Sequence, residues 1–192
     1  MTRQADNAPN LPAPAAGDLR ARIGWLCHGL RIAVCVWAGW TLALILWLWR
    51  SREQVAASYG GWWRLDLSAL PDAHYAAGLA LVLLDWAFVA LLCVMLWRML
   101  GLYLDGEVFS RAATDAMRRV GLVALAAILF DFLARPLVSW VLTLHLPAGA
   151  QRLNLFARPE DLLHLLFAGF VLALAHVFRA AAEIAEDNAG IV

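Results

Sequence analysis

Three charged side chains interrupt long apolar stretches of this sequence and are the first candidates for chemistry. Asp85 lies within the apolar run 75–97, and Asp131 and Arg135 lie within the run 120–146. A charge at the centre of a bilayer costs at least about 2.5 to 3.5 kcal/mol, so charges there are typical of proton relays, ion sites or mutually paired groups. Asp131 and Arg135 are four residues apart and therefore share one face of a helix.

These charges fall at a similar depth in the expected membrane. At about 1.5 Å per residue, Asp85, Asp131, Arg135 and His164 lie about 18 to 24 Å from the Arg residues that flank their apolar runs. We therefore expect Arg135 to bridge Asp131 on its own helix and Asp85 on the neighbouring helix. His164 could complete this intramembrane polar cluster from the last helix.

Two interpretations of the cluster remain open. It could be a proton relay or an ion site, because two carboxylates share one guanidinium and leave a carboxylate in excess. It could instead be an ion-paired pin that sets the register of neighbouring helices. We favour the pin, because four short helices are expected to enclose little cavity.

The composition excludes most soluble classes of protein. Hydrophobic residues make up 63% of the 192 residues, charged residues 16%, and the mean hydropathy is +0.69. The net charge is zero, so no basic footprint for direct nucleic acid binding is present. Nucleophile, phosphate-binding and HExxH motifs are absent, and the three Cys show no CxxC spacing. We expect no catalytic residue, no metal site and no enzyme activity.

The apolar runs define the expected fold. Four of them are long enough to cross a bilayer as helices, at about residues 32–49, 75–97, 120–146 and 162–178. The fold class is therefore all-α, a four-transmembrane-helix bundle formed by residues 18–192. Residues 1–17 are rich in Pro and polar residues and are expected to be a disordered tail.

The charges at the ends of the runs predict the orientation. Nine Arg residues lie in the two terminal flanks and the middle loop, against five in the other two loops. Because positive charge is retained inside, both termini are expected in the cytoplasm. Trp residues are expected to anchor both membrane interfaces, at Trp25 and Trp97 on the inner side and at Trp47, Trp49, Trp62 and Trp63 on the outer side.

A weak internal similarity suggests two tandem, parallel helical hairpins. The segment 18–26 resembles the segment 115–123 in the spacing of Asp, Arg, a β-branched residue and Gly. Arg-rich helix flanks resemble one another in any case, so chance similarity is the alternative.

Five His residues raise the possibility of haem between facing helices. His28 and His176 form the one candidate pair near the inner face, whereas His74 and His145 are expected near the outer face. With no CxxCH motif and no second clear pair, we expect no cofactor.

Two short motifs carry a resemblance to a known family. Gly106, Phe109 and Ser110 precede the third apolar run, and the C-terminal segment contains Glu186, Asp187, Asn188 and Val192. With four spans of these lengths, residues 18–192 resemble the bacterial membrane-protein family catalogued as domain of unknown function 2975. The resemblance implies a bacterial inner-membrane protein without an established activity, often encoded beside a small helix-turn-helix regulator.

The resemblance and the composition together favour a non-enzymatic interaction or regulatory module in the bilayer. Gly106, Phe109, Ser110, Glu186, Asp187 and Asn188 are then the candidates for a cytoplasmic interaction surface, with a helix-turn-helix regulator as the possible partner. A small transporter or proton-conducting bundle that uses Asp85, Asp131 and Arg135 is the alternative, and a haem b redox protein is the third reading.

Overall fold

A computed structural model describes residues 16–107 and 110–189, with side chains described for residues 24–107 and 110–184. These residues contain no strand and form five α-helices: α1 (Ala16–Leu48), α2 (Arg52–Trp63), α3 (Asp72–Leu104), α4 (Arg111–Thr143) and α5 (Pro159–Ala189). Four of these, all except α2, are long and apolar enough to cross a membrane. The all-α, four-span prediction is confirmed. Most of the expected tail lies outside the described residues, and α1 begins at Ala16.

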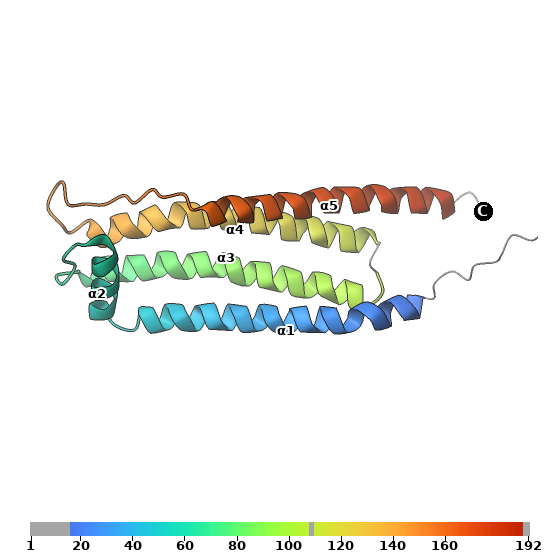
Figure 1. The fold of residues 1–192 in the computed structure, drawn as a ribbon, viewed down its shortest axis with the longest axis horizontal. Coiled ribbons are helices and arrows are strands. Elements are labelled where there is room, and N and C mark those ends of the chain that lie inside the picture. The colour runs from blue at the N-terminus through green and yellow to red at the C-terminus, as the bar shows by residue number, and fades with distance from the viewer. Residues whose placement is uncertain (1–15, 108–109, 190–192) are drawn as a thin grey trace, which may run out of the picture.

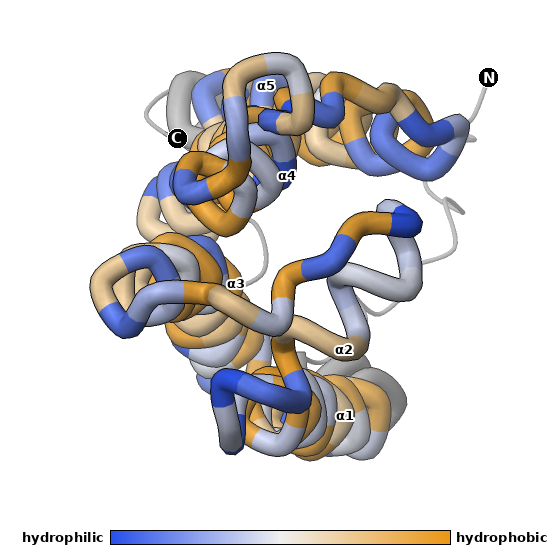
Figure 2. Tube along the Cα trace, turned by 90° about the vertical axis from the view of Figure 1, so that its left-hand side faces the viewer, coloured by the Kyte–Doolittle hydropathy of each residue, from blue (hydrophilic) through white to orange (hydrophobic). Residues whose placement is uncertain are grey.

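The four long helices stand side by side in the order α1, α3, α4, α5. Each packs against the next, and consecutive helices run antiparallel, so the N-terminal end of α1 and the C-terminal end of α5 lie at the same end of the molecule (Figure 1). Seen along the helices, they follow an arc with α1 and α5 at its two ends, and α2 lies on the open side (Figure 2). The pairs α1–α3 and α4–α5 form two successive hairpins, as the internal similarity suggests.

The two glycines of that internal similarity both face a partner helix. A Cβ added to Gly121 in α4 would lie 2.7 Å from the side chain of Leu172 in α5, and one added to Gly24 in α1 would lie 4.0 Å from Leu104 in α3. Gly121 therefore permits a close approach of α4 and α5, as small residues do in membrane helix pairs.

The turn between α3 and α4 explains the Gly106 and Ser110 motif. Gly106 has a φ of +90°, and its N–H and that of Glu107 donate to the carbonyls of Tyr103 and Leu102 in a Schellman arrangement that ends α3. The Ser110 hydroxyl then accepts from the Ala113 N–H at 3.1 Å and caps the start of α4. The motif thus builds the turn, while Phe109 lies outside the described residues.

The apolar core lies at the end of the molecule that carries α2. Its buried cluster is formed by Trp49, Val55, Leu70, Val138 and Leu142, while further buried apolar residues lie along the other helices. The expectation that Trp49 anchors the membrane interface is wrong, because its ring packs on Gly78 and the residue is only 4% exposed. Trp25, Trp47 and Trp62, by contrast, are largely exposed, as interfacial residues would be.

Helix α2 replaces part of an expected loop. Ser51 caps its first turn by accepting from the Gln54 N–H at 3.2 Å, and Arg64, with a φ of 55°, ends it. The helix crosses the ends of the long helices and does not run along them (Figure 1). It thereby brings Tyr59, Trp62 and Trp63 over the arc.

Candidate functional site: an intramembrane polar cavity

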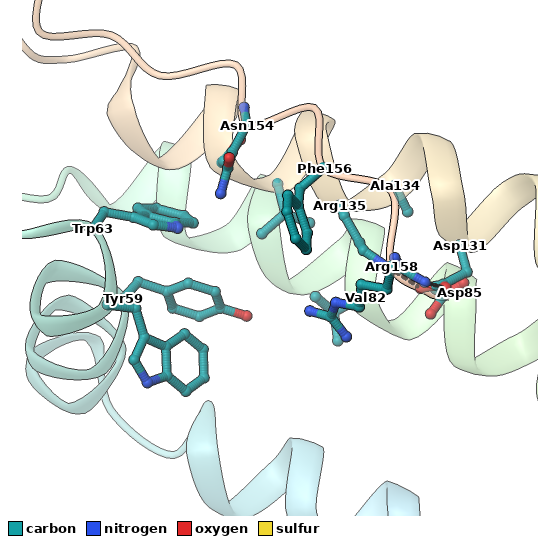
Figure 3. Close-up of a pocket in the computed structure, with 13 residues that line it drawn as sticks. Tyr59, Trp63, Val82, Asp85, Asp131, Ala134, Arg135, Asn154, Phe156 and Arg158 are labelled. Atoms are coloured by element: carbon teal, nitrogen blue, oxygen red, sulfur yellow. Dashed lines mark hydrogen bonds and ion pairs between the residues drawn. The ribbon is translucent and has the colours of Figure 1, made fainter. Parts of the chain in front are cut away.

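A cavity of about 380 Å³ lies between α2, α3, α4 and the segment that leads into α5 (Figure 3). Aromatic and charged residues share its lining: Tyr59, Trp62, Trp63, Val82, Asp85, Asp131, Ala134, Arg135, Val138, Ser139, Asn154, Phe156 and Arg158. The expectation that four short helices would enclose little cavity is therefore wrong. The space exists because the helices form an arc and α2 closes over it.

Arg135 is the centre of the ionic network on one wall of the cavity. It pairs with Asp131 through two hydrogen bonds, of which the one from Nε is 3.1 Å long. Its Nη1 and Nη2 atoms also donate to the two carboxylate oxygens of Asp161 at 2.8 and 2.6 Å. The expected pairing of Arg135 with Asp131 on one helix face is present. The second partner, however, is Asp161 of α5 and not Asp85 of α3.

Asp161 reaches Arg135 because of the way α5 begins. Pro159 is the first residue of the helix, and the Asp161 carboxylate reaches back to accept from the Arg158 N–H at 2.8 Å. Proline at the first position and an acidic residue that returns to the cap are typical helix-start signals. The sequence Arg-Pro-Glu-Asp carries both signals and marks the start of α5, but these signals do not identify the residue that Asp161 contacts.

The segment before α5 runs back along α4 and lets α5 begin beside the middle of that helix (Figure 1). Two buried hydroxyls of α4 hold it. Ser139 Oγ accepts from the Asn154 N–H, and Thr143 Oγ1 accepts from the Arg152 N–H, both at 3.0 Å. Non-helical backbone at membrane depth is tolerated only where it is buried in protein or lines a water-filled cavity. These hydroxyls satisfy two of the N–H groups of the segment.

Asp85 lies on the cavity wall formed by α3. It is half-buried and makes no hydrogen bond or ion pair with any residue that the structure describes. Among the charged groups at the cavity, three are carboxylates (Asp85, Asp131 and Asp161) and two are guanidinium groups (Arg135 and Arg158). Since Arg135 serves Asp131 and Asp161, the Asp85 carboxylate is the one left without a direct counter-charge.

Arg158 and the aromatic residues form the other part of the lining. The Arg158 side chain extends into the cavity between the aromatic rings and the Asp131–Arg135 pair (Figure 3). Its guanidinium makes no ion pair within the described part of the chain. Burial raises the pKa of Tyr59 above its usual range, so its hydroxyl stays neutral at physiological pH.

The His residues are placed differently from what the sequence suggested. His164 is exposed on α5 and does not line the cavity. Asp161 of the same helix instead joins the polar cluster, where His164 was expected. His28 and His176 lie on α1 and α5, at the two ends of the arc, and are not brought together (Figure 2). His74 and His145 do face each other, with ring centroids 5.9 Å apart.

The remaining interaction candidates lie near the termini. Glu186, Asp187 and Asn188 belong to the last helical residues of α5, and their side chains lie outside the described part of the chain. They lie at the same end of the molecule as the turn formed by Gly106 and Ser110 (Figure 1).

Comparison with known proteins identifies the family but no characterised relative. No curated protein matches the chain, and no solved structure matches it. Residues 66–192, from the segment before α3 to the C-terminal end, match a family described as protein of unknown function. That region contains Asp85, Asp131, Arg135 and Asp161, whereas α1 and α2 precede it. The chain, a protein with four candidate membrane-spanning helices, therefore belongs to the family DUF2975.

Proposed function

We propose that this protein is a non-enzymatic membrane module that binds a small amphiphilic molecule with a positively charged head group in the cavity, and that it signals occupancy to a cytoplasmic partner. The observation that carries the proposal is the Asp85 carboxylate, which lines an aromatic cavity and has no counter-charge of its own. A bound ammonium group would supply that counter-charge.

The energetics favour such a ligand. An ionised carboxylate at membrane depth costs about 2.5 to 3.5 kcal/mol, and a cation beside it would offset part of that cost. Aromatic rings such as those of Tyr59, Trp62 and Trp63 attract cations on their faces and also pack against apolar chains. Arg158 would bind an accompanying anionic group, so zwitterionic heads fit as well as simple ammonium heads.

The route from the cavity to the cytoplasm would run along α4 and α5. Arg135 connects the cavity wall to both α4 and α5, because it pairs with Asp131 and Asp161. The distribution of Arg residues predicts that the other ends of these helices lie in the cytoplasm, together with the turn at Gly106 and the end of α5. We propose that a small helix-turn-helix regulator, which the family resemblance suggests, binds at this end. The bacterial inner membrane is the location that this proposal requires.

The test compares single-chain amphiphiles that share one tail but carry ammonium, zwitterionic, carboxylate or neutral heads. The thermal unfolding temperature of the full chain in a neutral detergent should rise when the ammonium or zwitterionic compounds are added. A free ligand at 100 times its Kd should stabilise the protein by about 2.7 kcal/mol. The Asp85→Asn variant should lose this response, whereas Asp105→Asn, at the end of α3 and away from the cavity lining, should keep it. A response independent of head-group charge, or one retained in Asp85→Asn, would contradict the proposal.

Proton or ion conduction is the second candidate, because two carboxylates, Asp85 and Asp131, line one cavity within a membrane-spanning region. Liposomes that contain the protein and a pH-sensitive dye would test it. A proton flux that requires Asp85 would favour conduction, and an absence of flux together with ligand-dependent stabilisation would favour the binding module.

A further inference from the structure

A pair of His residues, His74 and His145, lies at the α2 end of the molecule and outside the lining of the cavity. His74 lies in the first turn of α3, and His145 follows the last turn of α4. Because α3 and α4 are antiparallel neighbours, these two ends meet. The ring centroids are 5.9 Å apart and the ring planes are inclined by 57°. Neither residue lines the cavity, so the pair is independent of the proposed ligand.

Three ring nitrogens of this pair are buried without a partner. Nδ1 of His74 and both Nδ1 and Nε2 of His145 are inaccessible to solvent and make no hydrogen bond within the described residues. A neutral imidazole has one N–H donor and one nitrogen lone pair. In His145 both are unsatisfied, and such orphan groups in native proteins call for a specific explanation, of which a bound ion is one.

The separation of the rings suits one metal ion held between them. A metal–imidazole bond is about 2.0 to 2.1 Å long, so two such bonds in line span about 4 Å between nitrogens. Each nitrogen lies about 1.1 Å from its ring centre, so two bonds in line would put the ring centroids about 6.3 Å apart. This is about 0.4 Å more than the observed 5.9 Å, a difference that a small movement of the rings would cover.

The number of ligands identifies the kind of ion. No group of three or more His, Cys, Asp or Glu residues in the described part of the chain is arranged to hold a metal. Zinc in proteins takes four ligands, and the buried nitrogens leave little access for the waters that would complete its shell. Imidazole is a good ligand for copper, and the cuprous ion is stable with two ligands in line.

We propose that His74 and His145 together bind one cuprous ion near the membrane interface. The binding requires only that each imidazole be neutral and turn a lone pair toward the other. No electron transfer is involved, because copper is bound as Cu(I).

The test uses the full chain in detergent, with Cu(I) supplied under anaerobic, reducing conditions and a coloured chelator as competitor. Because thiols also bind Cu(I), the measurement is made in a background in which Cys27, Cys35 and Cys93 are replaced by Ser. This background should bind one Cu(I) per chain. His74→Gln and His145→Gln should each weaken binding at least tenfold, and His164→Gln, an exposed His elsewhere, should leave it unchanged.

X-ray absorption on the copper-loaded Cys-free protein provides a readout that does not depend on the folding of the His74 and His145 variants. Two nitrogen ligands and no sulfur would support the proposal. Absence of stoichiometric binding, full binding in the His74→Gln/His145→Gln double variant, or a four-ligand shell would overturn it. Preferential binding of Zn²⁺ in the same competition assay would also overturn it.

Discussion

Arg135 and Asp161 join the middle of α4 to the start of α5 through two hydrogen bonds of 2.6 and 2.8 Å. The side chain of Arg135 is 23% exposed and that of Asp161 only 14%, so the pair is shielded from solvent. Removing one partner of a shielded pair leaves an uncompensated charge, whereas replacing both partners with neutral groups leaves no uncompensated charge from the pair.

The first prediction concerns this pair. Arg135→Leu should destabilise the protein by about 3 kcal/mol, because Asp161 and Asp131 lose their counter-charge together. The double change Asp161→Asn and Arg135→Gln should lower the free energy of unfolding by clearly less than the sum of the losses caused by the two single changes. The measurement is a double-mutant cycle on thermal unfolding in detergent, with Asp85 in place of Asp161 as the matched control. Equal coupling of Arg135 to Asp85 and to Asp161 would contradict the arrangement.

The second prediction concerns the hydroxyls that hold the segment before α5. Ser139→Ala should cost about 1 to 3 kcal/mol, because the Asn154 N–H loses its acceptor in a buried place. Hydrogen exchange should accelerate in residues 151–158 and not in α1.

The matched control for this change is Thr41→Val. The Thr41 hydroxyl bonds only to the Trp37 and Ala38 carbonyls of its own helix, so its loss should leave residues 151–158 protected. Unchanged exchange of that segment in Ser139→Ala would show that the hydroxyl does not hold it.

The third prediction uses the contact between Trp49 and Gly78. A Cβ at Gly78 would lie 2.7 Å from the Trp49 ring and 3.1 Å from Leu142, so Gly78→Ala should destabilise the core by about 1 to 3 kcal/mol. Gly39→Ala, where a Cβ meets nothing within 4 Å, should be neutral or stabilise its helix by up to about 1 kcal/mol. Thermal unfolding followed by Trp fluorescence separates the two, and a Gly78→Ala protein as stable as Gly39→Ala would refute the packing.

The fourth prediction concerns the turn between α3 and α4. Gly106→Ala should destabilise the protein by about 1 to 3 kcal/mol, since its φ of +90° strains any other residue. Ser110→Ala should cost about 1 kcal/mol through loss of the helix cap. Limited proteolysis should reveal faster cleavage of the turn in both variants. If either variant lost partner binding while its stability and cleavage stayed unchanged, the motif would be an interaction site and not only a turn.

The sequence predicted the number of spans and the pairing of Asp131 with Arg135, because apolar run length and four-residue spacing act within one helix. It did not predict Asp161 as the second partner. That contact depends on the path of residues 151–158, which run back along α4. The spacing of residues in the sequence does not predict this path. The burial of Trp49 was missed for a similar reason, since its neighbours Gly78 and Leu142 come from other helices.

The chemistry of the cavity was also only partly visible. Asp85 and Asp131 were recognised because a charge in an apolar layer is unfavourable. The sequence of α2 suggests a loop, because its apolar residues follow no strong helical period. The aromatic residues that α2 contributes to the lining, Tyr59, Trp62 and Trp63, could therefore not be assigned to the cavity, because their position depends on how α2 folds over α3 and α4.

Because the helices stand in a row, the outer sides of α1 and α5 have no neighbouring helix among residues 16–107 and 110–189. A molecule dissolved among the lipid tails could approach the concave side laterally, without first crossing either aqueous surface. We therefore expect the ligands of the cavity to be lipid-soluble compounds that enter it from the bilayer.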